Sequence, residues 1–242
     1  MLSQNGFEVE DRSAAEPIHR AELEALGYQS APVIVLGSRI FAGFPEENVR
    51  REIGLPAADF TYESTLVKLR SALAMLRHMR EVTAAIPDRF WWEQMYANRD
   101  HPLGHFVWSI YRFVRLVIET PAKGEFAYAD LKPSLLRTDW PEEEKFRTFA
   151  ALTSFADEMI AELAAWERTL TPESLDSEVD TPWGRVSMHS LIGILNEHTS
   201  LKFSLLFPKL AALDPDFPLL PTADLLRRFP AFEPPPGFPL RG

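Results

Sequence analysis

The sequence predicts an α+β protein that is mainly α, and three observations lead to this prediction. Four long segments repeat apolar residues at the 3.6-residue spacing of a helix. Before them, in residues 1–56, short strand-like and helix-like runs alternate. At the other end, nine of the chain's 20 prolines lie from Pro208 onward, and proline at this density does not sustain a helix. We therefore expect an α/β segment at 1–56, a helical bundle at 60–210 and an extended, Pro-rich C-terminal arm at 211–242.

Composition and charge narrow the classes of partner. The chain has 242 residues, a formal net charge of −10 and a pI near 5.1. Nucleic acids and anionic membrane surfaces attract basic patches, so neither is an expected partner. No apolar run reaches the ~18 residues of a membrane span, and the N-terminus lacks the features of a signal peptide, so we expect a cytoplasmic location. The absence of cysteine excludes disulfides and thiolate catalysis within this chain.

Residues 1–56 have the pattern of a small α/β unit. Apolar and polar residues alternate as in strands, and proline and glycine stand where helices begin and end. The expected elements are a strand at 7–10, a helix at 17–26, strands at 32–36 and 39–42 around a tight turn, and a helix at 45–53.

This order of elements, with YQSAPVIVLGSRIFAGFPEENVRREIGL, resembles the C-terminal two-thirds of a glutaredoxin, a thioredoxin-fold family. The resemblance implies that Ala31, the cis-proline position Pro32 and the Gly43–Phe44 turn bind a glutathione-type thiol. The family's first strand and Cys-x-x-Cys helix have no counterpart after Met1, so redox activity is not expected. The sheet then lacks a central strand, which another part of the chain, a second copy or a partner chain, or a longer gene product would supply.

The four helical segments predict a four-helix bundle, because each carries one apolar stripe. We expect helices from a cap at Ser64 to about Ile86, at 101–120, from Pro141 to about Leu170, and at 188–207, with Pro121 and Pro208 as helix ends. The connections at 122–138 and 171–186 are expected to be loops. Trp92 and Trp108 are candidates for an aromatic pocket wall, although packing is the commoner role of such rings.

Two polar residues, His198 and Lys202, interrupt the apolar stripe of the fourth helix one turn apart. In one interpretation Lys202 reaches water along its apolar stem. In the other both residues line a polar pocket in the bundle, because a buried cation is costly unless it is paired. His105 and Ser109 lie one turn apart on the second helix, so these four residues are the candidate catalytic groups.

The segments PLGHFVWSIYRFV and DTPWGRVSMHSLIGILNEHTSLKF are similar to the DinB/YfiT-like family of metal-binding four-helix proteins, over about residues 60–210. The resemblance implies a divalent metal held by one histidine on the second helix and two on the fourth. The matching positions are Ser109, His198 and Lys202, and a different register would move the last to Leu206. Only one histidine is retained, so a divalent metal is not expected, although His105 is a conceivable substitute ligand. The other histidines are expected at the surface or as caps: His19, His78, His101 and His189.

Three functions stay open. The first is a pocket in the bundle for a small organic molecule, such as a glutathione-type thiol or its conjugate, with the Lys–His pair as acid and base. The second is a non-catalytic structural or regulatory subunit of an oligomer. The third is a metal-dependent thiol S-transferase or isomerase with a rearranged site. No phosphate loop, Ser-His-Asp motif or zinc signature decides among them.

Overall fold

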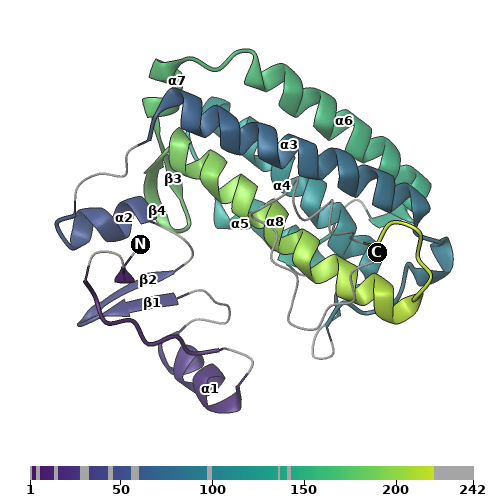
Figure 1. The fold of residues 1–242 in the computed structure, drawn as a ribbon, viewed down its shortest axis with the longest axis horizontal. Helices are drawn as coiled ribbons and strands as arrows, with labels where there is room; N and C mark the ends of the chain where they lie inside the picture. The colour runs from purple at the N-terminus through teal and green to yellow at the C-terminus, as the bar shows by residue number, and fades with distance from the viewer. Residues whose placement is uncertain are drawn as a thin grey trace.

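The computed structural model describes residues 2–3, 6–13, 16–27, 33–42, 46–55, 60–96, 100–135, 137–140 and 143–220. Long helices form a bundle, and a small α/β unit is attached at one end of it (Figure 1). The mainly α, α+β fold class is therefore confirmed. No described helix is both long and apolar enough to cross a membrane.

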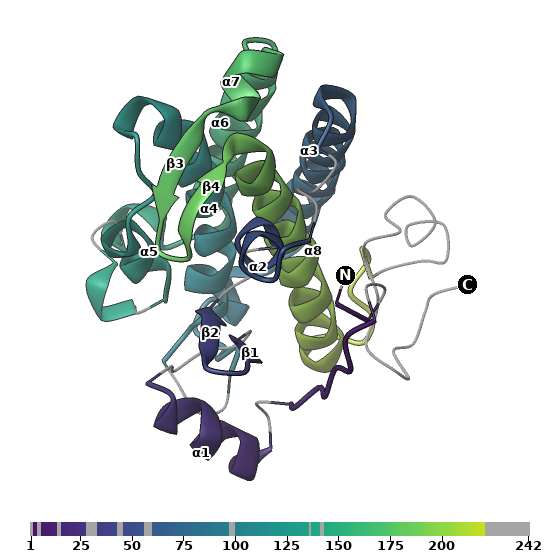
Figure 2. The same ribbon diagram turned by 90° about the vertical axis from the view of Figure 1, so that its left-hand side faces the viewer.

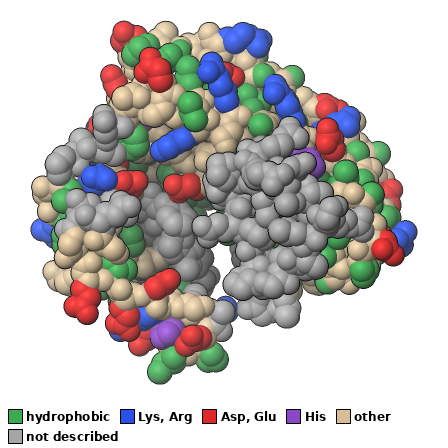
Figure 3. Space-filling view, in the orientation of Figure 1, with side chains coloured by type: hydrophobic (Ala, Val, Ile, Leu, Met, Phe, Trp, Pro, Cys, Tyr) green, Lys and Arg blue, Asp and Glu red, His purple; other side chains and the backbone are tan. Residues whose placement is uncertain are grey.

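Four helices make the bundle: α3 (Tyr62–Ala85), α4 (Leu103–Lys123), α6 (Phe149–Glu167) and α8 (Met188–Leu213). Helices α3 and α4 each pack against both α6 and α8, so the four close around one core. The expected apolar stripes face this core, and every residue of the α4 stripe is buried. Charged side chains of both signs lie over the outer surface of the bundle (Figure 3).

Several predicted helix boundaries are wrong. Helix α4 passes through Pro121 and ends at Gly124, whose φ of 76° closes the helix in the left-handed region. Helix α8 passes through Pro208 to Leu213, because burying Leu210 beyond the proline offsets the lost backbone bond. At the other ends, Thr61 rather than Ser64 caps α3, and α6 begins at Phe149 rather than at Pro141.

Both connections that were expected to be loops contain regular structure. Helix α5 (Tyr128–Leu135) lies within 122–138 and packs on α4. The short helix α7 (Pro172–Asp176) and the hairpin β3 (Glu178–Thr181) and β4 (Gly184–Ser187) lie within 171–186. The hairpin pairs Val179 with Val186, and both side chains are buried.

The N-terminal unit forms most of its predicted elements. These are α1 (Pro17–Ala25), β1 (Val33–Leu36), β2 (Arg39–Ala42) and α2 (Glu46–Glu52), and the two strands pair as an antiparallel hairpin. The expected strand at 7–10 does not form, because that segment is exposed and pairs with no described strand. Helix α1 lies away from the bundle (Figure 2) and buries none of its side chains.

Helix α2 joins the N-terminal unit to the bundle. Its Glu47 carboxylate accepts hydrogen bonds from the Ser187 N–H at 3.1 Å, the Ser187 hydroxyl at 3.0 Å and the Ser190 hydroxyl at 2.7 Å. The amide of Asn48 donates to the Trp183 carbonyl at 2.9 Å, and Val49 is fully buried. A carboxylate at the start of α8 also matches the positive end of the helix dipole.

Candidate functional site

Lys202 and Ser109 meet between α8 and α4. The Lys202 ammonium donates a hydrogen bond to the Ser109 Oγ at 3.2 Å, and the Ser109 hydroxyl donates to the Phe106 carbonyl at 2.7 Å. The ammonium also lies over the Phe106 ring, 4.3 Å from its centroid. Lys202 is half-buried and Ser109 is buried, so the cation is held against the core by a hydroxyl and an aromatic face.

His198 lies one turn before Lys202 on α8. Its ring stacks on Phe113, with centroids 4.0 Å apart and an interplanar angle of 18°. Burial, and secondarily the charge of Lys202, lower the pKa of His198 well below its usual value. The imidazole is therefore neutral near pH 7, and its buried Nδ1 has no hydrogen-bond partner in the described structure. We refer to Ser109, His198 and Lys202 together as the α4–α8 centre.

His105 belongs to the same region but faces a different neighbour. Its Nε2–H donates to the Pro133 carbonyl at 2.7 Å, which leaves Nδ1 as an acceptor. That Nδ1 is buried and finds no donor among the residues described. Burial lowers the pKa of His105 to about 4, against the opposing effect of the Pro133 bond, and the charges of Lys202 and Arg137 lower it further. The charge of Lys202 thus acts on both histidines.

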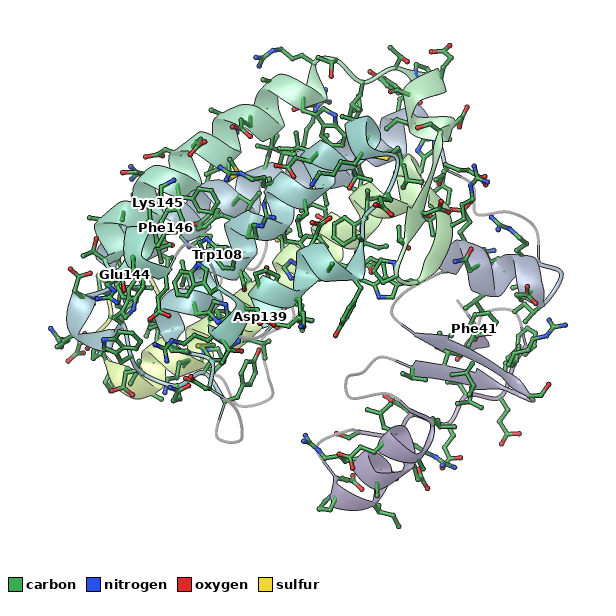
Figure 4. The ribbon with its side chains drawn as sticks, turned by 180° about the vertical axis from the view of Figure 1, so that it is seen from behind. Phe41, Trp108, Asp139, Glu144, Lys145 and Phe146 are labelled. Atoms are coloured by element: carbon green, nitrogen blue, oxygen red, sulfur yellow. The ribbon has the colours of Figure 1, made fainter. Side chains whose placement is uncertain are left out.

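The two tryptophans of the candidate pocket wall lie in different environments. Trp108 is buried on α4 (Figure 4) and packs with His105 and Trp140, at centroid distances of 5.7 and 5.1 Å. Trp92 instead is 51% exposed, and the Arg137 guanidinium covers its ring at 4.8 Å. Trp108 therefore belongs to the aromatic core beside the centre, whereas Trp92 lies at the surface.

The remaining histidines were expected at the surface or as caps, and two of them are buried instead. His101 is 1% exposed, and its ring centroid lies 4.5 Å from that of His105. His189 is 5% exposed, and its Nδ1 lies 2.6 Å from the Thr65 hydroxyl oxygen. His189 Nε2 lies 3.3 Å from Asp176 Oδ1, so this network ties α3 and α7 to the start of α8.

The donor set of the centre does not fit the divalent metal that the family resemblance implies. A protonated lysine has no lone pair for a metal, and Lys202 instead donates to the serine at the neighbouring ligand position. Of the three positions that match the family's metal ligands, only the one at His198 carries a histidine. Within the described ranges, no group of three or more histidine, aspartate or glutamate side chains is placed to hold a metal.

Among the surface clefts, two that are lined by described residues lie away from the α4–α8 centre. One lies between the end of α3 and the start of α6, beside Ile86 and Phe149. The other, of about 440 Å³, lies between β2, α2 and the β3–β4 turn. Three arginines line the second cleft, a feature that sequence reasoning missed because they come from three separate elements: Arg39, Arg51 and Arg185.

The predicted thiol-binding positions lie outside the described residues. These positions are Ala31, Pro32, Gly43 and Phe44. Comparison of the chain with protein-family models, with curated proteins and with solved structures gives no match. The candidate site therefore stands on its own geometry, in which Lys202 connects the groups that the sequence singled out.

Proposed function

We propose that the α4–α8 centre binds a small organic molecule through an acidic group, and that a glutathione-type thiol or thiol conjugate is its ligand. The observation that carries this proposal is the 3.2 Å hydrogen bond from Lys202 to Ser109. It joins residues 93 positions apart in the chain and places a cation against the bundle core. The ammonium would attract a carboxylate or thiolate in partly dehydrated surroundings, where charge interactions are stronger than in water.

The DinB-like resemblance suggests a chemical role for the positive charge of Lys202. In that pattern the positions of Ser109 and Lys202 hold metal ligands, and the metal supplies positive charge. Here the lysine ammonium would supply that charge, so an anion could bind without metal-dependent chemistry. The neutral imidazole of His198 would accept a hydrogen bond from a bound thiol through its buried Nδ1, which has no partner among the described residues. The proposal is therefore one of binding, with the charge of Lys202 as its main contribution.

Titration calorimetry with glutathione at pH 7.5 tests the proposal. We expect Lys202→Met to weaken binding about tenfold or more, because it removes the charge that attracts the ligand. Lys209→Met is the matched control, since Lys209 lies on the same helix and pairs with Glu93 at 3.8 Å, apart from the centre. Equal affinities for the two variants, or no binding by the unaltered chain, would contradict the proposal. Near-stoichiometric metal in elemental mass spectrometry would favour the metal-dependent transferase instead.

A second candidate function is that of a structural or regulatory subunit, for which the N-terminal unit gives a specific observation. Val35 and Ile40 pair across the β1–β2 hairpin yet are 52% and 39% exposed. Ile18 on α1 is 66% exposed, and Leu26, the residue that follows α1, is 40% exposed. A two-stranded sheet with this much exposed apolar surface is of marginal stability, and a second copy or partner chain would cover it.

Analytical ultracentrifugation tests the oligomer. If the hairpin is an interface, Val35→Glu should shift an oligomer toward monomer. Val67→Glu, at a 64% exposed apolar position on α3, should not. A monomer at all concentrations would argue against the subunit function.

A further inference from the structure

The arginine cleft lies where the N-terminal unit meets the bundle, and it is defined here by Arg39, Arg51, Arg185 and the aromatic residues Phe41 and Trp183. Its volume of about 440 Å³ is within the usual range for a small-molecule site. Phe41 on β2 lies on the side of its strand that faces α2 (Figure 4). Trp183 in the β3–β4 turn is half-buried and stacks on Phe126 at 5.7 Å, which fixes its ring.

Two of the three arginines share a carboxylate, and the third pairs with a neighbouring one. Arg185 Nε lies 3.1 Å from one oxygen of Glu178, and Arg51 Nη2 lies 3.9 Å from the other. Arg39 pairs with Glu52 at 3.0 Å, and Glu52 follows Arg51 on α2. A single carboxylate thus already lies between two of the guanidinium groups, which shows that an oxyanion fits between them.

Each guanidinium keeps donors for a ligand. Arginine carries five N–H donors, and the ion pairs described use Nε of Arg185, Nη1 of Arg39 and Nη2 of Arg51, the last facing both Glu47 and Glu178. The side chains of Arg39, Arg51 and Arg185 are 53%, 54% and 63% exposed, so a ligand in the cleft can reach them. Arginine forks match the oxygens of phosphate and carboxylate groups, and flat rings stack on aromatic faces.

We propose that the arginine cleft binds a small organic oxyanion, a phosphate or carboxylate group carried on a flat ring. The oxyanion would lie among Arg39, Arg51 and Arg185 and the ring against Trp183 or Phe41. Such a ligand would bridge α2 and the β3–β4 hairpin, and so would hold the N-terminal unit on the bundle. The proposal is independent of the α4–α8 centre, which shares no residue with the cleft.

Titration calorimetry with phenyl phosphate, inorganic phosphate and benzoate tests the cleft. We expect phenyl phosphate to bind with a Kd of about 1 mM or tighter, and more tightly than inorganic phosphate, which lacks the ring. Arg51→Gln and Arg185→Gln should each weaken it about 10- to 100-fold. Tighter binding of phenyl phosphate than of benzoate would assign a phosphate ligand, and the reverse order a carboxylate.

A variant that should bind phenyl phosphate more tightly tests the cleft more sharply than one that weakens binding. Glu178→Gln removes a carboxylate that competes for Arg51 and Arg185, and it should tighten binding of phenyl phosphate about 2- to 5-fold. Glu167→Gln and Arg70→Gln are matched controls, because this ion pair of 2.7 Å lies between α6 and α3. If the controls change the affinity as much as the cleft variants do, binding follows net charge and the proposal is wrong.

Hydrogen exchange locates the ligand on the intact chain. Phenyl phosphate should slow exchange in α2 and in the β3–β4 hairpin while leaving α6 unchanged. Absence of binding by the unaltered chain, or protection confined to other elements, would overturn the proposal.

Discussion

The α4–α8 centre and the arginine cleft differ in the burial and the charge of their ionisable side chains. Inside the bundle, burial keeps the imidazoles of His105 and His198 neutral, and few polar partners surround them. At the cleft, the arginines are exposed and keep their charges in pairs with glutamates. The first region should therefore respond to pH and the second to salt and added anions, since exposed charges are screened and buried neutral groups are not.

The two regions are linked by α8. Its first turn receives the Glu47 carboxylate from α2, and its middle carries His198 and Lys202. The N-terminal unit otherwise contributes little buried surface, because α1 buries no side chain. The attachment of that unit thus depends on a few polar contacts and the buried Val49, whereas the bundle depends on extensive apolar packing.

Acid should destabilise the bundle through its buried histidines. The pKa of His105 is about 4 in the folded chain and about 6.5 when unfolded, so the unfolded state binds more protons between these values. The contribution of neutral His105 to the unfolding free energy is about 3 kcal/mol. It is fully present above pH 6.5 and is lost as pH falls through 4. The pKa of His198 is also lowered in the folded chain, so acid should reduce the unfolding free energy through this residue as well.

Urea unfolding between pH 7.5 and 4 measures this loss. His105→Phe should flatten the pH dependence, because it removes the titrating group and keeps an aromatic ring beside Trp140. His19→Gln should leave the pH dependence unchanged, since His19 lies on α1, apart from the bundle. An unchanged slope in His105→Phe would show that burial of this imidazole does not control acid stability.

Added volume should distinguish the tightly packed start of α4 from the second turn of α8. A Cβ atom at Gly104 would overlap the Trp91 ring, and Trp91 is 2% exposed with Phe149 packed at 5.1 Å. Gly104→Ala should therefore cost about 1–3 kcal/mol of unfolding free energy. Gly193→Ala should instead stabilise the chain by about 0.5–1 kcal/mol, because its nearest neighbour would be Lys68 Nζ at 3.8 Å. Chemical denaturation of both variants checks the pair, and equal effects would contradict the packing difference.

The contrast also explains which features could be predicted from sequence. Periodicity identified the bundle helices and the buried faces of α3, α4 and α6, because apolar spacing directly reflects burial. It placed the end of α8 at Pro208 and missed the continuation to Leu213, because proline rules describe local cost and Leu210 packs through tertiary contact. The β3–β4 hairpin was missed because its strands, EVDT and GRVS, contain one apolar residue each, whereas the predicted strand β1 reads VIVL.

The site residues divide in the same way. Lys202 and His198 were found because they interrupt an apolar stripe, which is a signal within one helix. The residues that join the regions gave no such signal. Glu47 resembles any other acidic residue in the first turn of a helix, and the arginines of the cleft come from positions 39, 51 and 185. Their roles arise from contacts between distant elements, which one sequence does not display.

The attachment of the N-terminal unit gives the smallest of these effects. Glu47→Ala removes an acceptor shared by three donors at the start of α8, so it should cost about 1–2 kcal/mol. Glu46→Ala is the matched control, because Glu46 is exposed and pairs only with Arg50 at 2.8 Å among the described ion pairs. Hydrogen exchange should show the loss in α2 and the first turn of α8, with α6 unaffected. If Glu47→Ala instead weakens the whole bundle evenly, the N-terminal unit and the bundle unfold as one cooperative body, and the contrast drawn between them fails.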